Sequence, residues 1–142
     1  MDFTNFFEKQ GTLYLDDIKY NLISLEKDPK NIKIDYVDSV STELIESCSK
    51  LKVIFTRRVF HVPESIFELK VSYAAIYTFK EEYIGDSEIQ MMDFTTLLKT
   101  NKNTLFINIV SRTSLLISQI STSHGKIPFV TPPLYMERIH KQ

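Results

Sequence analysis

The chain has 142 residues, of which 43% are hydrophobic, and this size is typical of one globular domain with a core of its own. Its 17 basic and 18 acidic side chains give a net charge of −1, so the overall charge does not favour nucleic acid or an anionic membrane as a partner. The single cysteine, Cys48, excludes an intramolecular disulfide and a cysteine-rich zinc site.

No targeting or membrane segment is expected. The N-terminal residues MDFTNFFEKQ lack the apolar stretch of a secretory signal, and no apolar run approaches the ~18 residues that a membrane span needs. We therefore expect a cytoplasmic protein without membrane insertion, with one domain over 1–142, a flexible arm over 1–11 and a tail over 136–142. Phe3, Phe6 and Phe7 follow helical spacing, so docking of the arm is the alternative to fraying.

Between residues 13 and 79 the sequence alternates with the two-residue period of half-buried strands. The pattern predicts four strands, which begin near residues 13, 32, 51 and 66. The turn residues KDPKN separate the first two strands. Because no helical pattern lies between the strands, we expect antiparallel pairing through hairpins or a Greek-key return.

One position interrupts the strand pattern. Leu51, Val53 and Phe55 form the apolar face of the third predicted strand, and Arg57 falls on the same face. We therefore expect the strand to leave the core or to form a bulge at Arg57.

After Gly85 the period changes to that of helices. Ser87 and Gln90 have the spacing of a capping box, which predicts the start of a short helix. Asn103 is the predicted cap of a longer helix, and Gly125 is its predicted C-terminal stop. The apolar stripe of this helix contains Leu105, Phe106, Ile109, Leu116 and Ile120. Strands first and helices last predict the α+β class, with a four-stranded antiparallel sheet and the helices packed on one face.

The residues that could carry chemistry do not form a recognisable motif. His61, His124 and His140 are not spaced as a pair of metal ligands, and Cys48 lies beside acidic residues that disfavour a reactive thiolate. With three glycines the chain has no phosphate-binding loop. Basic and aromatic residues on the predicted sheet are interleaved with acidic ones. We expect no enzyme, no cofactor, no metal and no nucleic-acid partner.

The C-terminal third of the sequence resembles a known family. Residues 105–135 read LFINIVSRTSLLISQISTSHGKIPFVTPPLY, a helix with an internal Arg112 that runs into a glycine, an apolar stretch, paired prolines and a closing Tyr135. This arrangement resembles the SecB family of protein-export chaperones. The order of the predicted elements is also similar to SecB over about residues 12 to 136.

The resemblance implies an ATP-independent holdase that binds unfolded or non-native polypeptides in an apolar groove. SecB-like chaperones act in protein transport and translocation, form homo-oligomers that are commonly tetramers, and have no nucleotide or metal site. A strap of extended chain near the C-terminus would form one wall of the groove; the alternative is that it closes the core. The residues expected to contact the polypeptide are Ile127, Phe129, Val130, Leu134, Tyr135 and Phe60.

A SecA-type translocase motor is a further partner that the resemblance implies, and two departures argue against it. The sequence ends seven residues after Tyr135, without the C-terminal helix and acidic tail of SecB, and its charge is near neutral. These departures favour an alternative function, a SecB-fold binding module dedicated to one partner such as an antitoxin or a single exported protein. A third alternative is an enzyme or small-ligand protein whose site forms only in the folded chain.

Overall fold

The computed structural model describes residues 3–9, 11–22, 33–62, 67–100, 104–123, 130–133 and 135. A short 3-10 helix, η1 (Phe3–Phe6), precedes the strands β1 (Thr12–Leu22), β2 (Lys33–Ile45), β3 (Lys50–Val62) and β4 (Phe67–Thr78). A second 3-10 turn and three helices follow: η2 (Glu81–Tyr83), α1 (Ser87–Gln90), α2 (Phe94–Thr100) and α3 (Thr104–Ser123).

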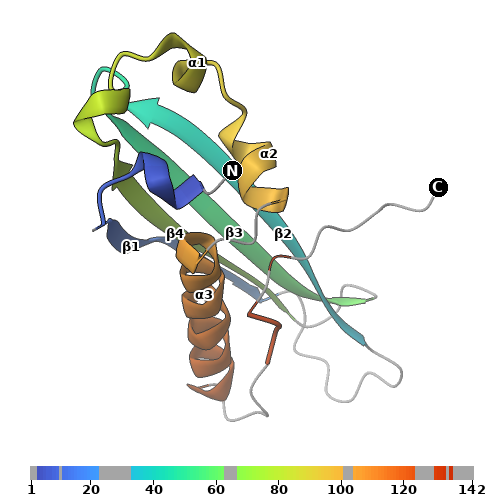
Figure 1. The fold of residues 1–142 in the computed structure, drawn as a ribbon. Helices are drawn as coiled ribbons and strands as arrows, with labels where there is room; N and C mark the ends of the chain where they lie inside the picture. The colour runs from blue at the N-terminus through green and yellow to red at the C-terminus, as the bar shows by residue number, and fades with distance from the viewer. Residues whose placement is uncertain are drawn as a thin grey trace, which may run out of the picture.

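The four strands form one antiparallel sheet in the order β1-β4-β3-β2 (Figure 1). β2, β3 and β4 are neighbours in sequence order, and β1 lies beside β4, which is a Greek-key arrangement. The predicted α+β class and the Greek-key sheet are therefore confirmed. β1 and β2 are the two edge strands of the described sheet.

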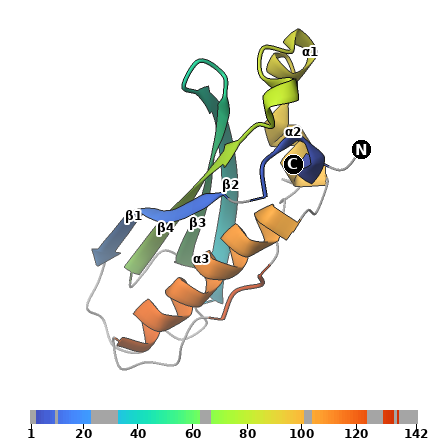
Figure 2. The ribbon, with the colours of Figure 1, turned by 60° about the vertical axis from the view of Figure 1, so that its left-hand side comes forward.

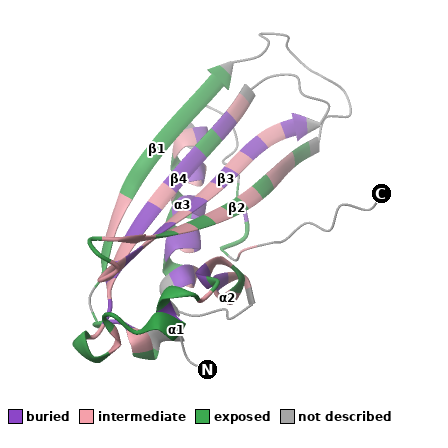
Figure 3. Ribbon diagram, turned by 90° about the horizontal axis from the view of Figure 1, so that it is seen from above, coloured by how far each residue is buried: buried purple, intermediate pink, exposed green. Residues whose placement is uncertain are grey.

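The sheet has one covered face and one open face, as β3 shows. Leu51, Val53, Phe55, Arg57 and Val59 are buried on one side of this strand, and the residues between them are half-buried on the other side. Figure 3 shows this alternation along β3 and β4, whereas most of β1 is exposed. We call the buried side the helix-bearing face and the other side the open face.

The long helix α3 packs across the helix-bearing face, mainly over β4 and β3 (Figure 2). Its fully buried apolar side chains are Phe106, Ile109, Val110 and Ile117. Leu116 and Ile120 of the predicted stripe pack at the edge of this core, and the side chain of Leu105 is not described. Asn103 and Gly125, the predicted ends of the helix, lie outside the described residues. Burial of one apolar stripe is what stabilises such a helix.

The N-terminal arm is docked on the body of the protein. Phe7 is 2% exposed and lies against Phe79 and Tyr77, with ring centroids 4.7 and 5.5 Å away. A main-chain N–H of the arm donates to a carbonyl at the end of β4, and a main-chain N–H just after β4 donates to a carbonyl of the arm. Docking rather than fraying is therefore the arrangement of residues 3–9.

The predicted bulge or departure of the chain at Arg57 is wrong. β3 pairs with β2 and with β4 through Arg57 without interruption, and the side chain of Arg57 is fully buried. The shift of register lies in β1 instead, between Leu15 and Asp17. Arg57 stays in the core because Asp38, directly opposite on β2, compensates its charge.

The predicted capping box at Ser87 is wrong by one residue. Asp86 is the N-cap of α1, and its carboxylate accepts from the N–H of Glu88 at 2.9 Å. A second aspartate, Asp93, accepts from the hydroxyl and the N–H of Thr96 at the start of α2. These hydrogen bonds hold the pKa of the Asp93 carboxyl below its ordinary value. Two caps therefore divide the expected single helix into two short ones.

Candidate functional site

The described C-terminal residues, 130–133 and 135, lie over β3 beside α3, and we call them the strap. Ile127, Phe129 and Leu134, three of the predicted contact residues, lie outside the described part of the chain. Val130 is 83% exposed, whereas Tyr135 is half-buried. The strap therefore presents one apolar side chain to solvent and packs another on the body.

Tyr135 anchors the strap to the apolar core. Its ring is 5.7 Å from the ring of Phe106 on α3 and 6.3 Å from the ring of Phe55 on β3. The rings of Phe55 and Phe106 also meet edge to face at 5.8 Å. Three aromatic residues from the strap, the helix and the sheet thus form one cluster, an arrangement that stabilises beyond the area buried.

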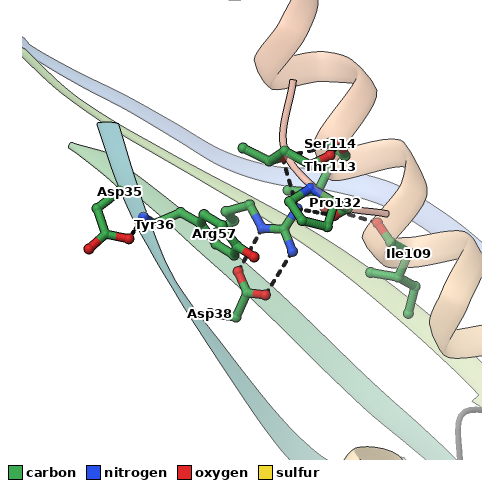
Figure 4. Close-up of polar contacts among 9 residues, drawn as sticks. Asp35, Tyr36, Asp38, Arg57, Ile109, Thr113, Ser114 and Pro132 are labelled. Atoms are coloured by element: carbon green, nitrogen blue, oxygen red, sulfur yellow. Dashed lines mark hydrogen bonds and ion pairs between the residues drawn. The ribbon is translucent and has the colours of Figure 1, made fainter. Parts of the chain in front are cut away.

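Arg57 on β3 binds the strap through hydrogen bonds. Its Nε and Nη2 atoms donate to the two carboxylate oxygens of Asp38, at 2.6 and 2.7 Å. Its Nη1 atom donates to the Thr131 hydroxyl at 2.9 Å and to the main-chain carbonyl of Pro132 (Figure 4). The side chains of both Arg57 and Asp38 are fully buried. One guanidinium therefore joins β3, β2 and the strap.

Ser114 on α3 also binds the strap through hydrogen bonds. Its hydroxyl donates to the main-chain carbonyl of Thr131, and the Thr131 hydroxyl donates back to the Ser114 oxygen at 3.1 Å. Both residues are buried. Each hydroxyl of this pair is satisfied inside the protein, as buried polar groups generally are. Figure 4 shows Ser114 and Arg57 on the two sides of the strap at Pro132.

Two aromatic rings flank the buried guanidinium. The carbon at its centre lies 4.8 Å from the ring centroid of Tyr36 and 5.5 Å from that of Phe55, within the range of cation–π attraction. Burial raises the pKa of the Tyr36 phenol, and the Arg57 charge opposes this rise. The phenol is therefore neutral at ordinary pH.

The structure does not bring Phe60 to the strap. Phe60 lies on the open face, where the guanidinium of Arg58 lies 4.4 Å above its ring and donates to Glu68. Strand alternation explains the separation, because successive residues point to opposite faces. It also separates Arg57 from Arg58, so the basic residues considered for nucleic acid do not form one surface.

The residues with reactive side chains are dispersed in the described structure. His61 is buried on the helix-bearing face, and Cys48 lies in the turn between β2 and β3. His124 and His140 lie outside the described residues. No group of three His, Cys, Asp or Glu side chains within the described ranges could hold a metal ion. In the same part of the chain, no helix is both long and apolar enough to cross a membrane.

Comparison with known proteins finds similarity only in three dimensions. No protein-family model matches the sequence, and no curated protein is significantly similar to it. Among solved structures, the chain is similar to the Mycobacterium tuberculosis SecB-like chaperone Rv1957, which was solved in complex with a ChAD peptide from the Rv1956 HigA1 antitoxin. The match has a TM-score of 0.60 at 8% sequence identity and covers 85% of each chain. The fold is SecB-like.

The polar contacts that hold the strap were missed by reasoning from the sequence, although one signal was present. Arg57 and Asp38 are both polar residues on otherwise apolar faces of neighbouring strands. Opposite charges on the apolar faces of two neighbouring strands predict an ion pair between the strands when the register places the two residues opposite each other. Thr131 and Ser114 carried no comparable signal, since serine and threonine are common on helices and in extended segments.

Proposed function

We propose that this SecB-like protein is an ATP-independent chaperone that holds non-native polypeptides in extended form. The fold likeness to a peptide-bound chaperone supports this proposal. One fold can carry several functions, so a feature of this chain's own surface must also favour polypeptide binding.

That feature is the apolar surface exposed on the edge strand β2 and on the strap. Exposed apolar surface of this kind marks sites that bind proteins, peptides or ligands. On the helix-bearing face these side chains are Ile34 of β2, which is 48% exposed, and Val130 of the strap, which is 83% exposed. This is the observation that carries the proposal.

We place the polypeptide along the strap and the residues adjacent to it in the sequence. The proposed contact residues are Ile127, Phe129, Val130, Leu134 and Tyr135. Phe60 is left out because it lies on the opposite face of the sheet. An extended client would gain about 25 cal/mol for each Å² of apolar area that it buries. Its main chain could also pair with the outer edge of β2, as in strand addition.

A second candidate function is a binding module dedicated to one partner. The specific observation is that the similar chaperone Rv1957 holds a peptide from an antitoxin. The two functions differ in selectivity: a holdase binds many unfolded chains, whereas a dedicated module binds one segment tightly. We retain export as a setting for either function, and the net charge of −1 weakens the case for docking of a SecA-type motor.

We further propose that the protein acts in the cytoplasm as a homo-oligomer. β1 is an edge strand, and on its helix-bearing side Leu15, Ile18 and Tyr20 are each more than 40% exposed. An uncovered apolar edge of this kind favours pairing with another chain. A second copy that covers this side would remove the apolar area from water.

The experiment is calorimetric titration of the protein with a permanently unfolded, reduced polypeptide and with the same polypeptide in its folded form. We expect binding of the unfolded form alone. Val130→Asp should weaken it about tenfold, because burial of a valine side chain is worth ~1.5 kcal/mol. Met91→Asp is the matched control, since Met91 is 87% exposed on the turn after α1. Equal binding of both forms would overturn the proposal, and tight binding of one sequence alone would favour the dedicated module.

A further inference from the structure

The guanidinium of Arg57 is held in one orientation. Asp38 accepts from Nε and Nη2, at 2.6 and 2.7 Å, and the central carbon of the guanidinium lies 4.8 and 5.5 Å from the ring centroids of Tyr36 and Phe55. A bidentate pair of this kind fixes both the position and the plane of the donor. Nη1 is therefore directed at the strap by contacts that do not involve the strap.

The strap is held largely through its main chain. Nη1 of Arg57 donates to the carbonyl of Pro132, and the Ser114 hydroxyl donates to the carbonyl of Thr131. Every residue of any polypeptide has such a carbonyl. Two fixed donors that bind consecutive carbonyls therefore suit an extended chain of almost any sequence, including segments with proline.

The surroundings of these donors suit the side chains of such a chain. Phe55 and Phe106 form an aromatic bed beside the donors, and Tyr135 of the strap rests on it. Polar donors for the main chain and an apolar bed for side chains are the two components of peptide recognition. Here both are occupied by the protein's own C-terminal segment.

We propose that Arg57 and Ser114 form a main-chain-binding subsite for extended polypeptide, and that the strap fills this subsite in cis until a client displaces it. The proposal rests on the proposed polypeptide-binding function and specifies where one part of the client binds. The strap then competes with the client for this subsite through Thr131 and Pro132, and once displaced it still contacts the client through its apolar side chains, Val130 among them.

The free-energy cost of displacing the strap from the subsite is moderate. Among the described strap residues, Val130, Pro132 and Pro133 are exposed, so Thr131 and part of Tyr135 are the strap side chains that lose burial when it is displaced. Arg57 keeps its bidentate contact with Asp38, so its charge stays compensated. The affinity measured for a client is reduced by the fraction of molecules in which the strap occupies the subsite. Weakening the strap should therefore strengthen client binding.

A single tryptophan can report on the strap, because the chain contains none. In a Tyr135→Trp variant the indole should rest on Phe55 and Phe106 and emit at short wavelength. Titration with a permanently unfolded, reduced polypeptide should shift the emission to the red, with the same midpoint as the calorimetric titration. Tyr83→Trp is the control, since Tyr83 packs on Phe6, away from the strap, and should not respond.

A second variant tests the competition directly. Thr131→Val keeps the shape and the main-chain carbonyl but removes the hydroxyl that bonds to Arg57 and Ser114. We expect client affinity to rise at least about fivefold, because the competing state loses two hydrogen bonds and the loss of one ordinary hydrogen bond alone has about that effect. Thr113→Val is the matched control, because the buried Thr113 hydroxyl bonds within α3 to the Ile109 carbonyl.

The outcomes separate this inference from the proposed function. Client binding without an emission shift in Tyr135→Trp, or with equal affinities for Thr131→Val and Thr113→Val, would overturn the subsite while the chaperone function stands. Failure of the parent protein and of every variant to bind unfolded polypeptide would overturn both. Binding by Thr131→Val that is tighter than binding by the parent protein, together with the red shift, would support both.

Discussion

Arg57 and Asp38 lie directly opposite each other on β3 and β2 and form a fully buried, bidentate ion pair at 2.6 and 2.7 Å. The next residue, Arg58, forms an ion pair with Glu68 on the open face, where both side chains are at least a quarter exposed. The protein therefore contains two arginine–carboxylate pairs that share a strand and differ mainly in burial.

This difference predicts unequal effects of removing each carboxylate. Asp38→Asn should lower the free energy of unfolding by about 3–5 kcal/mol, because it leaves the Arg57 charge buried without compensation. Glu68→Gln should lower it by at most about 1 kcal/mol, as is usual for exposed pairs. Urea unfolding at neutral pH, followed by circular dichroism, measures both values. Similar losses for the two variants would contradict the assignment of Arg57 to the core.

The Arg58–Glu68 pair also predicts a pH dependence. The hydrogen bond from Arg58 holds the pKa of Glu68 below its ordinary value, so the folded state binds a proton less readily than the unfolded state. Its stabilising contribution is complete above the unfolded pKa and is lost as pH falls through the folded pKa. The difference in stability between the native protein and Glu68→Gln should be constant above about pH 5.5 and shrink below about pH 4.3. A difference that grows on acidification would refute this prediction.

A charged substitution on the apolar side of β1 should weaken the self-association of the protein. Ile18 is 41% exposed on the helix-bearing side of this edge strand, and Ile18→Lys should lower the mass of the assembly measured by light scattering. Asn21→Lys is the control, because Asn21 is exposed on the other side of the same strand. If the native protein is a monomer at all concentrations tested, the proposed self-association is wrong.

Gly11 allows a close approach to Tyr77. A Cβ atom at Gly11 would lie 2.7 Å from Cδ1 of Tyr77, whose ring is buried. Gly11→Ala should therefore cost about 1–3 kcal/mol of unfolding free energy through overpacking. The double variant Gly11→Ala, Tyr77→Leu should show a favourable coupling energy in a double-mutant cycle. Simple additivity of the two single changes would exclude a steric origin of the cost.

A glycine substitution in the turn between β2 and β3 should stabilise the folded protein. Glu46, Ser47 and Cys48 all have positive φ, with 55° at Ser47, a conformation that costs L residues roughly 1–2 kcal/mol each. Ser47→Gly should raise the free energy of unfolding by about 0.5–1 kcal/mol, since the entropy of glycine in the unfolded chain offsets part of the gain. Ser41→Gly, at an exposed position within β2, should have the opposite sign. Thermal unfolding compares the two, and a loss of stability in Ser47→Gly would contradict the prediction.

Local patterns in the sequence were sufficient to predict the four strands, the long helix and the faces that they bury. The alternation through Leu51, Val53 and Phe55 predicts both a strand and the side that it buries, because side chains of a strand repeat with period two. The stripe through Phe106 and Ile109 predicts a buried helix face for the same kind of reason. The C-terminal motif, through its resemblance to SecB, also indicated the fold that the structural comparison supports.

The candidate site depended on contacts between distant residues, which such patterns do not encode. Arg57 was predicted to disturb its strand because its neighbours in sequence gave no partner for its charge. The partner, Asp38, became identifiable only when the strand register placed the two side chains opposite each other. The N-cap of α1 lies at Asp86, one residue before the predicted position, for a related reason. Several polar residues follow one another there, and the side chain of each could accept a hydrogen bond from the first N–H groups of the helix.

The sequence by itself therefore determined the α+β class, the two faces of the sheet and the absence of a recognisable catalytic motif, because these follow from periodicity and residue type. Only the tertiary structure decided that Arg57 and Ser114 meet the strap at Thr131 and Pro132. Those contacts join residues 17 and 75 positions apart. Their formation depends on how α3, β3 and the C-terminal segment dock together, and docking is a property of the whole packed chain.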